Sequence, residues 1–490
     1  MEASLHLPLI IVILHIVNLF CLILLIRSGL QILYDHPKLY WTDHTTDDNH
    51  WLRFGKKIMP KDKLWTARDE AETPPGVIAL PGGEHNLGSG RHWHFTVAVI
   101  WLTTGIIYLG YLLFSGTWNR ILPTDWNVFG AAITVMGSYL TLNIPAEGAT
   151  YNALQQLSYA VMIFVVAPVS VLSGLALSPA LVAKYPGYLR LFGNRRQIAR
   201  SVHFLAMVAF SLFILVHMTM TLGLHFYSSV QRFTFGHTDV NFAAALTLFL
   251  VIVALLVIFN IWATLFSLNH PERLRGALMK LYMPVVKLAF GKMKSNQHYR
   301  KSDISPFFRV NGYPPETDEY DKLKASDFKD WKLKIHGMVE QPIELSLADI
   351  QSMRKQTQIT KHICIQGWTG VAEWAGVPMR DILKLCKPHK AATYVIFWCY
   401  DYYPDGTQFY AGLKTSDMQD KQTILAYEMN GEALPINHGA PIRLRVENKS
   451  GYKMAKYIQS IEFVDDFSHI GKGRGGHRED AFMFDWEASI

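Results

Sequence analysis

The stretch RSVHFLAMVAFSLFILVH, residues 200–217, decides the fold of the first half of this chain. No Asp, Glu, Lys or Arg occurs from residue 201 to 231, and about 20 apolar residues are enough for a helix to cross the hydrocarbon core of a membrane. Within lipid, backbone polar groups must be bonded inside the segment, which favours a helix. The stretch therefore predicts a transmembrane helix that carries two histidines, His203 and His217.

Residues 7–26, 92–119, 148–183 and 240–271 are likewise free of Asp, Glu, Lys and Arg. The first of them lacks a basic n-region and an A-x-A site, so we do not expect a cleaved signal. Residues 128–142 are apolar but Gly-rich and short, and they predict a loop or a re-entrant helix. The chain is therefore expected to be an integral protein of a bacterial-type inner membrane, with five helices near residues 7–30, 93–115, 152–176, 201–226 and 241–268.

Composition agrees with a membrane chain and excludes several other classes. Half of the 490 residues are hydrophobic and 18% are charged, against about 25% charged residues in soluble domains. The net charge of +7 does not imply nucleic acid, because membrane loops also collect Lys and Arg. The cysteines form no CxxC pair, which argues against a disulfide framework and a structural zinc site; they are Cys21, Cys364, Cys386 and Cys399.

A second unit begins near residue 305, where charges, Pro and Gly return. Short apolar runs predict strands at 331–335, 393–399 and 442–446, and cap residues predict helices from Leu347 and from Pro378 to Cys386. We expect an all-α transmembrane bundle over 1–270 and an α+β domain over 305–490. The basic segment 271–304 suits an interfacial stretch on an anionic leaflet, and a solvated linker fits it equally well.

Loop charges predict the orientation in the membrane. With five helices, the amino terminus and the α+β domain lie on opposite sides. The loops on the amino-terminal side hold two basic residues, Arg120 and Arg232, whereas the loops on the other side are rich in Lys and Arg. The positive-inside rule therefore places the α+β domain in the cytoplasm.

Four histidines lie inside the predicted helices, where polar side chains are costly and mark function. His203 and His217 are 14 residues apart, close to four turns or about 21 Å along one helix face. Counting depth from each helix end matches His94 with His203 and His15 with His217, which favours two haem sites in the bundle core. The alternative is that the histidines bond to each other, to carbonyls or to headgroups. Four more are expected at the surface: His92, His225, His237 and His270.

Two runs in the α+β domain carry candidate chemistry. In KHICIQGW, residues 361–368, Cys364 follows a strand and enters a Gly-containing turn, which makes it a candidate thiolate ligand or nucleophile. A buried structural cysteine is the ordinary alternative. Further along, His438, Arg443 and Lys456 converge on a Gly-rich turn and can hold an anionic phosphate.

Residues 1–270 resemble the di-haem cytochrome b subunits that partner hydrogenases and formate dehydrogenases. The resemblance implies two b haems bound at His15, His94, His203 and His217. Ile16, where many relatives have Trp, and the fifth helix depart from the family. The segments that carry the likeness are His15 to Gly29, His36 to Trp41, Arg91 to His94, Asn152 to Gln155, and Arg200 to His203 with His217.

Residues from about 305 to 465 resemble the molybdopterin domain of the sulfite oxidase family, and most of all its methionine-sulfoxide-reductase branch. The resemblance implies that Cys364 binds molybdenum and is the catalytic residue. Cys399 falls near a position where relatives place Thr beside the cofactor, although a core cysteine is as good a reading. The implied contacts to the pterin and its phosphate are Asn311, Cys399, His438, Arg443 and Lys456.

Together these features predict a membrane-bound molybdenum oxidoreductase. Its b haems would relay electrons between a quinone or other membrane or periplasmic carrier and a molybdopterin that reduces a small S- or N-oxide. Sulfite oxidation is the alternative, but Ile365–Thr369 lacks the arginine pair with which sulfite oxidases bind sulfite. Lys361, His362 and Arg309 are other possible sources of positive charge. A haem-only electron carrier and a membrane-anchored binding module are the remaining classes.

Overall fold

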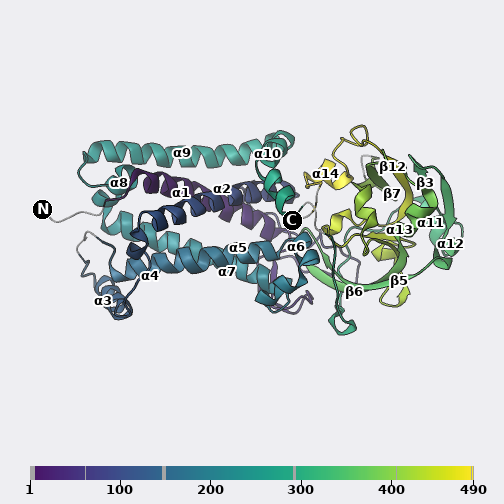
Figure 1. Ribbon diagram of the computed structural model, residues 1–490, viewed down its shortest axis with the longest axis horizontal. Helices are drawn as coiled ribbons and strands as arrows, with labels where there is room; N and C mark the ends of the chain where they lie inside the picture. The colour runs from purple at the N-terminus through teal and green to yellow at the C-terminus, as the bar shows by residue number, and fades with distance from the viewer. Residues whose placement is uncertain are drawn as a thin grey trace.

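The computed structural model describes residues 6–60, 62–145, 150–290, 294–403, 406–486 and 488. Five helical segments in it are long and apolar enough to cross a membrane, which confirms the predicted number. They run side by side along the long axis of the molecule (Figure 1). The spans are α1 (Leu9–Tyr34), α2 (Leu87–Phe114), α4–α5 with a π-helical turn between them (Ala153–Ala176), α7 with its π-helical end (Arg196–Leu224) and α9 (Phe242–Asn269).

Two spans begin earlier than the charge gaps predicted. α2 starts at Leu87 instead of 93, and α7 starts at Arg196 instead of 201. The side chain of Asp43 accepts hydrogen bonds from the first two backbone amides of α7, at 3.3 Å from Arg196 N and 2.9 Å from Gln197 N. A carboxylate at a helix amino terminus is favourable. Charged residues can therefore lie in the first turns of α7, because the loop before α2 supplies their hydrogen-bond partners.

The end of the bundle that holds the amino terminus carries two short helices, α3 (Val128–Leu140) and α8 (Phe226–Phe235). Residues 128–142 were predicted as a loop or re-entrant helix, and the loop reading is wrong because 13 of them are helical. α3 exposes an apolar row at helical spacing, with Phe129 50%, Ile133 66% and Leu140 78% exposed. This row is placed to contact lipid.

The segment after the fifth span is mostly helical. α10 (Pro271–Phe290) packs one face against α2 and α9, with Leu274, Leu278, Tyr282 and Val286 buried. A solvated linker is therefore ruled out for α10. Its other side exposes Leu281 by 61% and Leu288 by 91%, as an interfacial helix would. Residues 291–293 of the predicted linker lie outside the described residues.

The carboxy-terminal unit is an α+β domain built on two five-stranded sheets. The residues buried between the sheets include Trp331, Phe397 and Ile461. All strand pairs are antiparallel except β12 with β3. The first sheet holds β5 (Gln356–Ile363), β6 (Thr369–Pro378), β9 (Ile424–Met429), β10 (Glu432–Ala433) and β11 (Arg443–Arg445); the second holds β4 (Ile343–Ser346), β3 (Lys332–Gly337), β12 (Ile458–Val464), β7 (Tyr394–Tyr402) and β8 (Gln408–Lys414).

The elements predicted for this domain are present. The three predicted strands correspond to β3, β7 and β11, and the two predicted helices to α12 (Leu347–Ser352) and α13 (Met379–Cys386). Ser346 and Asp349 form a reciprocal capping box at the start of α12, a pattern that satisfies two backbone amides. α11 (Asp318–Ala325) adds a further short helix.

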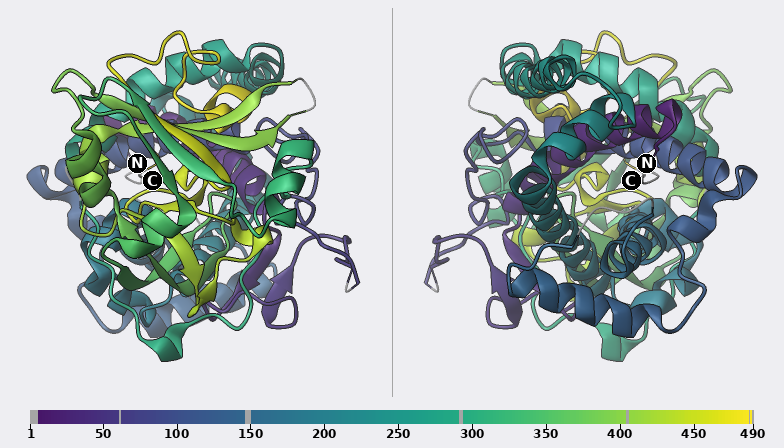
Figure 2. Two further views of the ribbon diagram at one scale, coloured as in Figure 1. Left: turned by 90° about the vertical axis from the view of Figure 1, so that its right-hand side faces the viewer. Right: turned by 90° about the vertical axis from the view of Figure 1, so that its left-hand side faces the viewer.

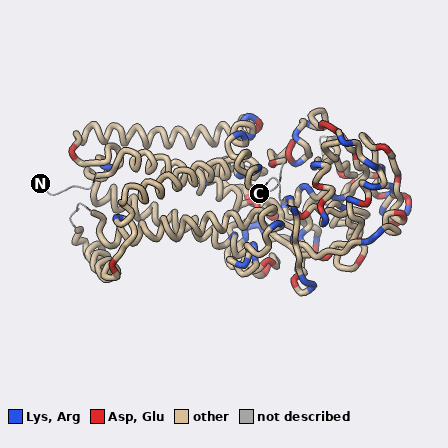
Figure 3. The backbone as a smooth tube through the Cα atoms, viewed as in Figure 1, with Lys and Arg blue, Asp and Glu red and all other residues tan. Residues whose placement is uncertain are grey.

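The two units join end to end. The described amino-terminal residues lie at the far end of the bundle, and the chain returns to the junction at its carboxy terminus (Figure 1). Figure 2 views the molecule along the bundle from both ends, with the sheets in front in one view and the helices in the other. Lys and Arg gather at the end of the bundle that meets the α+β domain, and the helices are nearly free of charge along their length (Figure 3).

Candidate functional site

Cys364 lies in a tight loop between β5 and β6. Cys364 N donates to the carbonyl of Trp368 at 3.1 Å, and Gly367 N donates to the carbonyl of Cys364 at 3.1 Å. The Cys364 side chain is buried, with Asn311 Nδ2 at 3.9 Å and Gln366 Oε1 at 3.7 Å from its sulfur. The structure thus brings together Cys364 and Asn311, two of the predicted site residues.

Burial raises the pKa of the Cys364 thiol to about 12. The thiol is therefore protonated near neutral pH in the protein alone, which argues against a free nucleophilic thiolate. A metal ion that binds the sulfur would displace the proton. The ligand reading of Cys364 consequently fits its surroundings better than the nucleophile reading.

A cluster of cationic side chains lies beside this loop. Arg443 Nη1 donates to the His438 carbonyl at 2.8 Å, and Lys456 Nζ donates to the carbonyls of Gly312 and Asn437 at 3.1 Å each. Gly312 follows Asn311 in the chain, so Lys456 and the Cys364 sulfur contact adjacent residues of one segment. The predicted phosphate residues His438, Arg443 and Lys456 are therefore close together.

Two residues outside the predicted phosphate set extend this cluster. Arg445 Nη1 lies 3.0 Å from His362 Nδ1, and Arg445 also makes a two-bonded ion pair with Glu447. Burial, followed by the positive charge of Arg445 and Arg443, holds the pKa of His362 well below its usual value. Burial together with neighbouring cations also lowers the pKa of Lys456 to about 7. An anion bound among these groups would relieve their mutual repulsion.

The donors of the cluster include atoms that the chain itself leaves unused. Among the described residues, His362 Nε2 and Arg443 Nε are buried without a hydrogen-bond partner. A side chain at Gly451 would clash with the imidazole of His362, so the glycine permits this close approach. Buried donors of this kind are normally satisfied. The cluster therefore fits the anionic phosphate of a pterin cofactor.

Cys399 lies at the border between this cluster and the core. It is fully buried among the residues packed between the two sheets. Burial raises its pKa well above the usual value, and Asp401 and Lys456 are its main charged neighbours. The position suits a core cysteine that lines the back of the Lys456 site.

The four membrane histidines form two pairs in the bundle. The ring centroids of His94 and His203 are 6.1 Å apart, and those of His15 and His217 are 6.2 Å apart. Imidazole nitrogens bind metal ions at about 2.0–2.1 Å, which puts two imidazoles on opposite sides of one iron roughly 6 Å apart by centroid. Each pair thus has the spacing that a bis-histidine haem requires.

The pair nearer the α+β domain also has oriented rings. His94 Nδ1 is 3.0 Å from Ser28 Oγ, and His203 Nδ1 is 2.9 Å from the Ser170 carbonyl. Metal-binding histidines almost always use their second nitrogen in this way. Nε2 of each ring is left for a ligand. Gly29 and Gly174 pack against the two rings, at 3.6 and 3.2 Å from an added Cβ to the ring carbon Cε1.

The Cys364 loop rests directly on the first turn of α7. Gly367 O accepts hydrogen bonds from Arg196 Nη1 at 3.1 Å and from Gln197 Nε2 at 2.8 Å. His203 follows Arg196 by seven residues, about 10 Å along the helix. One helix therefore connects the Cys364 loop to both histidine pairs.

The three residues that the sequence offered as further sources of positive charge have separate roles. Lys361 pairs with Asp43, the residue that caps α7. Arg309 is buried and donates to Glu70 Oε2 at 3.0 Å. Glu70 also accepts from Lys38 Nζ at 2.6 Å. Lys361 and Arg309 thus hold the two units together, and His362 lies in the cluster with Arg443 and Lys456.

One of the histidines expected at the surface is buried. His92 is 2% exposed, with Nδ1 at 2.8 Å from Tyr282 OH and Nε2 at 2.6 Å from the Met483 carbonyl. The prediction was wrong because α2 starts before His92 and because the carboxy-terminal tail covers it. His270 is exposed as expected, and His225 and His237 are partly exposed.

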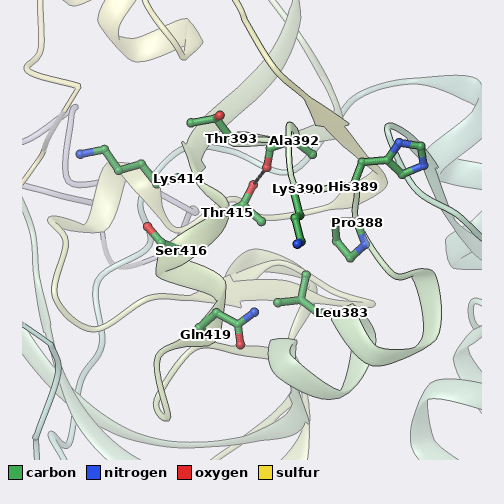
Figure 4. Close-up of a pocket in the computed structure, with 10 residues that line it drawn as sticks. All are labelled: Leu383, Pro388, His389, Lys390, Ala392, Thr393, Lys414, Thr415, Ser416 and Gln419. Atoms are coloured by element: carbon green, nitrogen blue, oxygen red, sulfur yellow. Dashed lines mark hydrogen bonds between the residues drawn. The ribbon is translucent and has the colours of Figure 1, made fainter.

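A hollow on the α+β domain is separate from this site. It is lined by α13, the loop after it and the segment after β8, and the Thr415 hydroxyl donates to the Ala392 carbonyl at 2.6 Å within it (Figure 4). None of its lining residues contributes to the Cys364 loop or the cationic cluster. The candidate chemistry therefore lies at the junction of the two units and not in this hollow.

Comparison with known proteins identifies the two units. Residues 6–236 match the family model of prokaryotic cytochrome b561, and residues 320–469 match that of the oxidoreductase molybdopterin binding domain. The protein-methionine-sulfoxide reductase catalytic subunit MsrP of Campylobacter jejuni is 30% identical over 209 residues, which cover 39% of this chain and 70% of that protein. The chain is a fusion of a cytochrome b561 domain and a sulfite-oxidase-family molybdopterin domain.

Other relatives agree with this fusion. A putative protein-methionine-sulfoxide reductase subunit, YedZ1 of Azospira oryzae, is 30% identical over 182 residues, covering 37% of this chain and 63% of that protein. MsrP of Xanthomonas campestris is 32% identical over 179 residues, covering 34% of this chain and 55% of that protein. The resemblances read from the sequence are confirmed, and the fused protein is a membrane oxidoreductase with molybdopterin and b haem as its cofactors.

The sequence missed the contributions that the cytochrome b561 domain makes to the molybdopterin site. Ala67 O accepts a hydrogen bond from Gln366 Nε2 at 3.0 Å, and Asp35 is a charged neighbour of Cys364. Burial raises the pKa of Asp35 to about 6. No local pattern marks these residues. The segment His36–Trp41, which follows Asp35, carried part of the resemblance to the di-haem cytochromes but did not indicate a contact with Cys364.

Proposed function

We propose that this protein is a membrane-bound reductase of S- or N-oxides, in which electrons cross the bundle to a molybdopterin held at Cys364. The observation that carries the proposal is the docking of the Cys364 loop on α7, the helix that also bears His203 and His217. The names of the MsrP and YedZ1 relatives favour a sulfoxide as substrate.

The proposed roles in the molybdopterin domain follow from the contacts described above. Cys364 is the molybdenum ligand, and His438, Arg443 and Lys456, extended by His362, bind the phosphate of the pterin. Asn311 lies against the ligand sulfur and orients the cofactor there. When bound, the cofactor supplies oxygen-atom transfer, in which an oxide, two electrons and two protons give the reduced compound and water.

The histidine pairs set the proposed direction of electron flow. His15 lies near the start of α1 and His217 near the end of α7, which is the amino-terminal end of the bundle. His94 and His203 lie in the second or third turn of α2 and α7, toward the molybdopterin domain. When bound, two b haems supply single-electron steps at these two depths. Electrons from a quinone or another membrane or periplasmic carrier enter near His15 and leave near His203. The electron donor and the number of haems are part of the proposal.

The proposed sidedness puts the molybdopterin domain in the cytoplasm. Lys and Arg concentrate at the end of the bundle that meets this domain (Figure 3), which the positive-inside rule assigns to the cytoplasm. A fluorescent protein that matures only in the cytoplasm, fused to the carboxy terminus, is expected to be bright. Alkaline phosphatase at the same position, active only outside the cytoplasm, is expected to be silent, and the reverse pair of results would contradict the sidedness.

The first test is a count of metal and haem in detergent-purified protein. We expect about one molybdenum by mass spectrometry and two b haems by pyridine haemochrome per chain, because one ligand cysteine and two histidine pairs are present. Two haems without molybdenum would favour a haem-only carrier. Molybdenum without haem would contradict the histidine pairs, and colourless protein without either would favour a binding module.

Sulfite oxidation is the second candidate for the same centre. The five residues after Cys364 contain no arginine, so the loop itself offers no cation to sulfite. Turnover of sulfite with ferricyanide as acceptor, faster than reduction of any sulfoxide or N-oxide with a reduced viologen as donor, would favour the oxidising direction and overturn the proposed one.

A further inference from the structure

Two arginines from outside the matched molybdopterin segment lie near Asn311 and the Cys364 loop. Arg68 belongs to the loop between α1 and α2, and Arg478 belongs to α14 (His477–Phe482) in the carboxy-terminal tail. The segment that matches the molybdopterin domain ends at residue 469. The positive charge that the Cys364 loop lacks is therefore present, but other parts of the fused chain provide it.

Arg478 is held beside Asn311 and Cys364. An added Cβ at Gly312 would lie 3.7 Å from Arg478 Nη2, and the neighbouring Asn311 contacts the Cys364 sulfur at 3.9 Å. The guanidinium rests on three aromatic rings, at 5.8 Å from the centroid of Tyr403, 5.7 Å from Phe409 and 5.4 Å from Phe482. These rings fix the arginine without neutralising its charge.

Arg68 approaches the same place from the membrane unit. The preceding residue, Ala67, forms two hydrogen bonds with the molybdopterin domain. Its N donates to the Val310 carbonyl at 2.9 Å, and its O accepts from Gln366 Nε2 at 3.0 Å. The guanidinium of Arg68 lies 4.9 Å from the centroid of Phe482, the ring that Arg478 also contacts. The two guanidinium groups thus share one aromatic platform.

The charge of this pair is poorly compensated. Within the part of the chain that the structure describes, no ion pair or hydrogen bond engages Arg478, and Arg68 Nη2 meets only His85 Nε2, at 2.9 Å. The carboxylate nearest in sequence to Arg68 is Asp69, and it accepts hydrogen bonds from Thr66 and Tyr313 instead of from either guanidinium.

We propose that Arg68 and Arg478 form an anion-binding subsite beside Cys364, and that the oxo substrate binds with a negatively charged oxygen group between them. Guanidinium groups recognise carboxylates and oxyanions through paired hydrogen bonds. Arg68 is exposed and Arg478 is partly exposed, so the subsite opens to solvent, as substrate entry requires. The inference deepens the proposed function, on which it rests, by naming the charge of the substrate.

The proposed subsite needs both units of the fused chain. One arginine comes from the cytochrome b561 domain and the other from the tail. The tail contacts the membrane part of the chain where Met483 O meets His92 of α2 and where Arg474 Nη2 pairs with Glu272 of α10 at 2.6 Å. A molybdopterin domain without its membrane partner would lack Arg68. Substrate selection in this chain therefore depends on the docked arrangement of both units.

The test uses the full-length holoenzyme and two matched substrates, N-acetylmethionine sulfoxide and its uncharged methylamide, with reduced viologen as donor. We expect the carboxylate to be preferred, and Arg478→Gln or Arg68→Gln to lower kcat/KM for it by about ten- to hundredfold through KM, with the amide unaffected. Chlorate and nitrate carry the negative charge on the oxo group itself. Their reduction by the wild-type protein, and its loss in Arg478→Gln, would show that the arginines bind the oxo group. Arg478→Lys should restore part of the preference.

Lys472→Gln is the matched control, since it removes a positive charge from the same tail and Lys472 is exposed. It should leave the carboxylate-to-amide ratio unchanged. A second readout does not need turnover: sulfate should raise the Tm of the wild-type protein and of Lys472→Gln, but not that of Arg478→Gln. An unchanged substrate ratio and an unchanged sulfate shift in both pocket variants would overturn the subsite. Sulfate binding without reduction of any oxide would retain the subsite and reject the proposed function.

Discussion

Replacing Cys364 by serine is expected to abolish oxide reduction while leaving the haem spectrum intact. The sulfur lies in a loop fixed by two backbone hydrogen bonds, beside Asn311 and a cluster of cations. Serine keeps the size of the side chain but not the soft thiolate that molybdenum requires. We expect kcat with reduced viologen to fall by at least about 10³-fold, equivalent to ~4 kcal/mol in the barrier.

The controls separate this loss from misfolding. Cys386→Ser removes a different buried thiol, at the end of α13, and should keep activity. The haem bands of Cys364→Ser should match the wild type in position and intensity, because the histidine pairs lie in the bundle. Pterin content is expected to stay near wild type, since the cationic cluster is intact. Full activity in Cys364→Ser would remove this residue from the proposed mechanism.

The membrane part of the fold was predictable because it follows from local rules. A helix rises about 1.5 Å per residue, so counting residues from each end gives depth. That count was enough to match His15 with His217 and His94 with His203, which the structure places 6.2 and 6.1 Å apart by centroid. The motif around Cys364 was likewise local, because a strand, a turn and a strand position it.

The junction between the two units was not predictable, because its partners are far apart in the chain. The pair of Lys361 with Asp43 joins residues 318 positions apart, and that of Arg309 with Glu70 joins residues 239 apart. Hydrophobic periodicity and residue spacing are local patterns and do not predict contacts between distant residues. The same cause explains the error at His92, whose cover comes from Met483, 391 positions away. The anion subsite of Arg68 and Arg478 belongs to this class.

A single alanine substitution in either histidine pair is expected to remove one haem and to interrupt electron transfer at the depth of that pair. His203→Ala should lose the haem nearer the molybdopterin domain, and His217→Ala the haem nearer the amino terminus. In either variant the haem content should fall from two per chain to one, because an alanine offers no ligand to the iron. Quinol-driven reduction should fall by at least about 100-fold, or ~2.7 kcal/mol in the barrier.

The same variants test the pairing itself. His15→Ala should lose the same spectral component and reduction potential as His217→Ala, and His94→Ala the same as His203→Ala. Loss of one component by both His15→Ala and His203→Ala would contradict the pairs. His270→Ala is the control, because His270 is exposed at the end of α9. Reduced viologen, which delivers electrons directly to the site at Cys364, should restore oxide reduction in every histidine variant, because the lesion lies in the relay and not in the chemistry.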